Sequence, residues 1–75
     1  MTSDKFKSIV AAVISSKEPH LSSFGTADLN ALARDYSSGK ADISAAIERL
    51  EALYKETDTI DRHDFAEIEK RLQRA

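Results

Sequence analysis

The chain has 75 residues, with 11 basic and 13 acidic side chains and a net charge of −2. This balance excludes the strongly basic proteins whose overall field draws them to nucleic acids or anionic membranes. Because the sequence has no cysteine, it excludes disulfide bonds and fits a reducing compartment, so we expect a cytoplasmic protein. A single core of this size gives a net stability of only about 3–5 kcal/mol. We therefore expect support from self-association, as a homodimer.

A first helix is predicted over about residues 3–16. Its apolar side chains recur at steps of three and one, which is typical of a helical stripe: Phe6, Ile9, Val10, Val13 and Ile14. The run is too short for a membrane span or for the apolar part of an export signal. A connection follows over residues 15–25 and is broken by Pro19. We expect Leu21 and Phe24 to close one end of the core from this connection.

A second helix is predicted over about residues 26–36. Thr26 is a suitable N-cap, and Asp28 lies in the first turn, where the helix dipole favours an anion. The apolar stripe of this helix consists of Leu29, Leu32, Ala33 and Tyr36. After it come Ser37, Ser38 and Gly39, and we expect Gly39 to adopt the left-handed conformation that ends many helices.

The third and fourth helices are predicted over about residues 42–55 and 61–73. Asp42 caps the third helix, and Asp61 with Asp64 forms a capping box at the fourth. Ile60 is placed to pack against Phe65 across that cap. The two stripes are Ile43, Ala46, Ile47, Leu50, Leu53 and Tyr54, then Phe65, Ile68 and Leu72. The whole chain thus predicts an all-α fold, a compact bundle of four short helices in one small domain.

Nothing in the sequence predicts catalysis, a cofactor or a metal ion. The serines occur in pairs at expected helix ends and turns, where capping explains them without a nucleophilic role. His63 and Glu67 lie one turn apart, but two ligands on one solvated face make only a weak metal site. A calcium loop starting at Asp35 fails because Ala46 stands at its twelfth position, which needs a bidentate acid. We expect a protein that is not an enzyme.

One pattern favours DNA binding. Residues 26–53 match the apolar spacing of a helix–turn–helix, in which Ala33 is followed by Tyr36, Ile43 and Ile47. The residues that contact DNA would then be Lys40, Ser44 and Arg49. The predicted recognition helix also carries Asp42, Glu48 and Glu51, which the phosphates would repel.

The favoured hypothesis is a small regulatory or adaptor protein that binds another protein, with the helix–turn–helix regulator as the alternative. Phage and bacterial regulators are often this short. The predicted contact surface lies on the third and fourth helices, with an apolar centre of Leu53, Tyr54, Phe65, Ile68 and Leu72 and a rim of Glu51, Lys55 and Arg71. The same five apolar residues could equally form ordinary core, and the sequence leaves both possibilities open.

Overall fold

The computed structural model describes residues 1–17 and 27–75, which contain four α-helices and no strand. The helices are α1 (Ser3–Ile14), α2 (Ala27–Ser37), α3 (Ile43–Leu53) and α4 (Arg62–Arg74). The predicted all-α fold is confirmed, and every helix begins and ends within two residues of its expected position. The predictions for Pro19, Leu21, Phe24 and the Thr26 cap lie outside the described residues.

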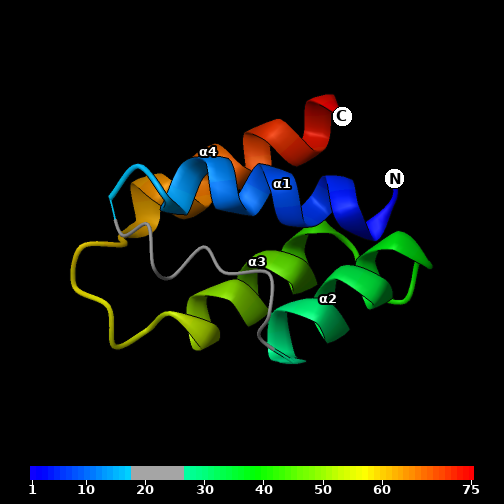
Figure 1. The fold of residues 1–75 in the computed structure, drawn as a ribbon, viewed down its shortest axis with the longest axis horizontal. Coiled ribbons are helices and arrows are strands. Elements are labelled where there is room, and N and C mark those ends of the chain that lie inside the picture. The colour runs from blue at the N-terminus through cyan, green and yellow to red at the C-terminus, as the bar shows by residue number, and fades with distance from the viewer. Residues whose placement is uncertain (18–26) are drawn as a thin grey trace.

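The four helices pack as a closed ring. Each helix packs beside the next one along the chain, and α4 returns to pack beside α1, whereas the backbones of α1 and α3 do not approach each other closely, nor do those of α2 and α4. In Figure 1, α1 and α4 form one layer above α2 and α3, and both chain ends lie on the same side. At the opposite end, the Lys17 ammonium lies 3.1 Å from the Asp64 carboxylate. α1 and α4 therefore run antiparallel.

Side-chain caps fix the starts of three helices. The Thr2 hydroxyl accepts a hydrogen bond from the N–H of Lys5 at 3.1 Å, and Asp42 accepts one from the N–H of Ala45 at 2.8 Å. The predicted capping box at α4 is confirmed, because Asp61 accepts from the N–H of Asp64 while the Asp64 carboxylate accepts from the N–H of Asp61 at 3.0 Å. Each cap satisfies backbone N–H groups that have no partner inside the helix.

The turn between α2 and α3 is a Schellman motif. The N–H of Lys40 donates to the Asp35 carbonyl at 2.9 Å, and the N–H of Gly39 donates to the Tyr36 carbonyl at 3.3 Å. Gly39 has a φ of +85°, as expected from the sequence. This left-handed residue turns the chain back sharply, so that α3 packs against α2.

One apolar core joins the four helices. It takes a stripe from each of them, together with Tyr54 and Ile60 from the connection between α3 and α4. The remaining core residues are Phe6, Val10, Val13, Ile14, Leu29, Leu32, Ala33, Ala46, Ile47, Leu50, Phe65, Ile68 and Leu72. The rings of Phe6 and Tyr36 also lie 5.0 Å apart between centroids, which ties α1 to the end of α2. The predicted stripes are thus the buried faces, with Ile9, Tyr36, Ile43 and Leu53 only partly covered.

Replacing Gly39 tests the turn. A Cβ at this position meets no atom within 4 Å, so any loss of stability comes from the backbone alone. We expect Gly39→Ala to lower the free energy of unfolding by about 1–2 kcal/mol, the cost of placing an L-residue in the left-handed region. Urea titration measures the loss. A synthetic chain with D-alanine at position 39 should recover it, and a D-alanine chain as unstable as Gly39→Ala would contradict the explanation.

Candidate functional site

The structure places most of the predicted apolar contact centre inside the chain's own core. Ile68 is 0% exposed, Leu72 3%, and Tyr54 and Phe65 7% each. Burial also raises the pKa of the Tyr54 hydroxyl above its ordinary value. These four side chains pack between the helices, so they cannot present an apolar centre to a partner while the fold is intact. Of the two possibilities that the sequence left open, these four side chains fit ordinary core in the described structure, and of the five residues Leu53 alone stays partly exposed.

The predicted rim residues do lie on the surface, but the structure does not gather them around an apolar patch. Glu51, Lys55 and Arg71 are exposed. The Arg71 guanidinium donates to the Glu67 carboxylate one turn earlier in α4, at 2.9 Å, and this bond lowers the pKa of Glu67. Arg71 thus belongs to a solvated helix face.

The three residues of the DNA-binding alternative are exposed as well. Lys40 lies in the turn, Ser44 in the first turn of α3, and Arg49 near its middle. The Arg49 guanidinium donates to the Asp35 carboxylate of α2 at 2.8 Å. The single basic side chain of α3 (Ile43–Leu53) is therefore directed at the neighbouring helix.

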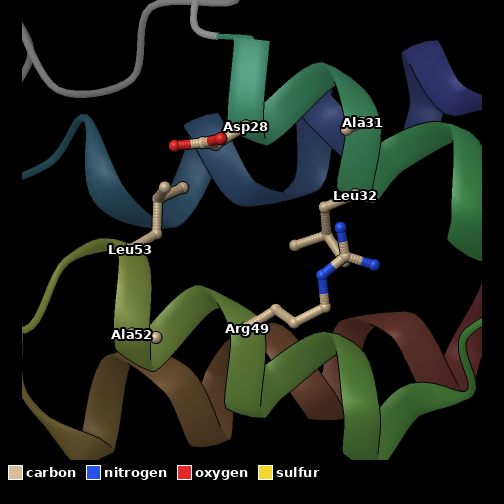
Figure 2. Close-up of a pocket in the computed structure, with 6 residues that line it drawn as sticks. All are labelled: Asp28, Ala31, Leu32, Arg49, Ala52 and Leu53. Carbon is tan, nitrogen blue, oxygen red and sulfur yellow. The ribbon is translucent and has the colours of Figure 1, made fainter.

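A surface pocket lies between α2 and α3, at the ends of these helices that are distant from the Gly39 turn. It encloses about 290 Å³ and is lined by Asp28, Ala31, Leu32, Arg49, Ala52 and Leu53. Figure 2 shows these side chains on the facing sides of the two helices, with Asp28 and Leu53 on one side of the opening and Leu32 and Arg49 on the other. We call these six residues the α2–α3 groove.

The groove exists because two of its residues are alanines. Ala31 and Ala52 end at Cβ, so neither helix fills the space between them. Leu32 is buried at the base, whereas Ala31 and Leu53 are partly exposed. The volume is about twice that of an apolar cavity that holds benzene, ~150 Å³. A large aliphatic or aromatic side chain from outside would fit.

The two charged residues of the groove are held differently. Arg49 is tied to Asp35, and this hydrogen bond lowers the pKa of Asp35 below its ordinary value of 3.8. The folded pKa is lower than the unfolded one, so the pair favours the folded state above about pH 4 and stops doing so as the pH falls through the folded pKa. Asp28 has no hydrogen bond or ion pair to any described residue.

A second charged cluster lies at the junction of α1 and α4 and is structural. Lys17 lies 3.1 Å from the Asp64 carboxylate and 3.9 Å from that of Asp61. Burial raises the pKa of Asp61, but the N–H groups of Asp64 and His63, with Lys17, outweigh it and leave the pKa below 3.8. The Asp61 and Asp64 carboxylates thus serve the helix cap and the ion pair with Lys17, which accounts for the cluster without a ligand.

The sequence prediction missed the groove as a unit, although it named parts of it for other reasons. Leu53 belonged to the predicted interface and Arg49 to the predicted DNA contact, while Asp28 was seen only as a helix-dipole partner. The signal that could have revealed the groove is the pair of alanines. Ala31 and Ala52 flank the apolar stripes at positions that face the space between α2 and α3. Their importance appears only once α2 and α3 are seen side by side (Figure 2).

The described residues hold no group of three or more His, Cys, Asp or Glu side chains placed to bind a metal ion. None of the described helices has the length and apolar content needed to cross a membrane. No family model, curated protein or solved structure matches this chain.

A larger side chain at Ala31 tests whether the space between α2 and α3 is empty. Ala31→Leu adds three carbons at a half-buried position, and partial burial should raise the free energy of unfolding by about 1 kcal/mol. Urea titration of this variant beside Ala66→Leu, an exposed alanine of α4, separates filling from a change in helix propensity. An equal effect of the two substitutions would show that the space between α2 and α3 is already filled.

Proposed function

We propose that this chain is a small non-enzymatic adaptor or regulator that acts by binding another protein in the α2–α3 groove. The groove carries the proposal. Leu32 forms its apolar base, and the small Ala31 and Ala52 form its walls. Asp28 and Arg49 place a charged group on each side, and an apolar lining with a few polar groups is usual for a binding site. Much of the remaining described surface is charged or polar, so the groove is where a partner could bury apolar area.

The surface of the chain favours a partner of different sequence in this groove. A pocket of about 290 Å³ needs a large side chain to fill it. Met1 is the one large apolar side chain that is exposed among the described residues, at 42%. The described part of a second copy therefore offers little that could enter the groove, whereas another protein can supply the anchor that dominates most interfaces.

Charge supports protein binding over the helix–turn–helix alternative. On α3, the exposed Arg49 is flanked by the exposed acids Glu48 and Glu51, and its guanidinium bonds Asp35. A helix that reads DNA needs donors for phosphates and base edges, and acids beside them oppose binding.

The test compares two matched variants in capture experiments. Ala52→Glu puts a charge into the groove, and Ala66→Glu puts the same charge on the exposed face of α4. We expect a protein captured by the natural chain to be lost with Ala52→Glu and retained with Ala66→Glu, when both variants keep the helical circular dichroism of the natural chain. Equal capture by both variants would contradict the groove as the binding site.

Binding to random duplex DNA is the matching control, measured by fluorescence anisotropy at two salt concentrations. We expect a dissociation constant no tighter than about 10⁻⁵ M at physiological salt, which is in the non-specific range. Submicromolar binding that weakens with Lys40→Ala and Arg49→Ala would replace the adaptor proposal with the DNA-binding one.

Homodimer formation stays a prediction, based on the small core and the lack of cysteine. If the chain dimerises, mass action raises its melting temperature with protein concentration. Melting curves at tenfold concentration steps, with sedimentation at the same concentrations, measure both quantities. A constant melting temperature with a monomer mass throughout would end the dimer prediction and leave the groove proposal intact.

A further inference from the structure

The shape of the groove restricts the kind of segment that a partner can place in it. Strand addition needs an exposed sheet edge, and the described residues form no strand. Recognition of proline-rich segments uses grooves lined by aromatic rings, and no aromatic residue lines this one. The remaining common mode lays an amphipathic helix between two others.

The two walls suit a helix. Ala31 on α2 and Ala52 on α3 are the smallest side chains that keep helix propensity, so they let a third helix approach both neighbours closely. One large apolar side chain of that helix can enter the space between the alanines and reach Leu32 at the base. Leu53 covers the anchor from the side.

The charges restrict the partner further. Asp28 stands beside the opening with no partner among the described residues. Burying its carboxylate under a bound helix without a cation would be costly, whereas a Lys or Arg pairs with it. On a helix, a side chain three or four positions from the apolar anchor lies on the same face.

We infer that the groove binds an amphipathic helix with one large apolar anchor and a Lys or Arg one turn away that pairs with Asp28. This inference rests on the proposed function, since it names the segment that enters the same groove. Arg49 lies on the other side of the opening, held by Asp35, and favours a carboxylate or carbonyl of the bound segment. The two charges thus set the orientation of the helix, because the reverse order brings like charges together.

A displayed library of random 16-residue helical peptides tests this inference on the full chain. Peptides are selected on the natural sequence and depleted against Ala52→Glu. We expect the survivors to share a Leu, Ile, Met, Phe or Trp with a Lys or Arg three or four positions away, to become helical on binding, and to bind Asp28→Lys at least tenfold more weakly. Asp28→Asn is the neutral control and should weaken binding less.

The outcomes separate the two proposals. Peptides that are lost with Ala52→Glu but show no basic position, or that bind Asp28→Lys as well as the natural chain, would overturn the charge pairing and leave the groove as a binding site. Peptides that bind in an extended form would overturn the helix. A selection that yields no peptide sensitive to Ala52→Glu would overturn the inference together with the proposed function.

Discussion

Burial of four apolar stripes in one shared core is the constraint on which the rest of the structure depends. The helices have 11 to 13 residues, a length at which isolated helices are marginal in water. Each of them places at least one side chain out of contact with solvent: Phe6, Leu29, Leu50 and Ile68 are all 0% exposed. Because every helix depends on the same core, none is expected to stay folded without the others. The caps and ion pairs add stability to helices that the packing of the core already holds in place.

The sequence predicted the features that depend on near neighbours in the chain. The caps at Asp42 and Asp61 and the left-handed Gly39 each involve residues within a few positions of one another. Periodicity identified the buried faces for a similar reason, since one helix turn brings residues three and four apart onto the same face. These local signals can be interpreted without knowledge of the tertiary structure. For this reason the predicted helix bounds lie within two residues of the observed ones.

The sequence left open whether the apolar centre of the predicted contact surface is core or interface, because local patterns do not name the covering element. Phe65, Ile68 and Leu72 have the spacing of a helix face that must be covered, but their pattern does not say whether α1 and α3 or another protein covers them. In the structure α4 packs against both helices, and those three residues are buried in the core. The sequence did not predict the groove, for a different reason. Ala31 and Ala52 matter through the space that they leave, and that space exists only between two helices whose relative position the sequence does not state.

A gap between two helices is not evidence of function by itself, because natural proteins are seldom packed to their maximum stability. The charges around this gap are what distinguish it. Arg49 donates across to Asp35 of α2 at 2.8 Å, which directs its guanidinium toward α2, and Asp28 keeps a carboxylate that no described residue uses. A charge beside an apolar space penalises a partner that brings a like charge to it. Charges of both signs at the opening of an apolar space would favour some partners over others, and a packing defect alone would not.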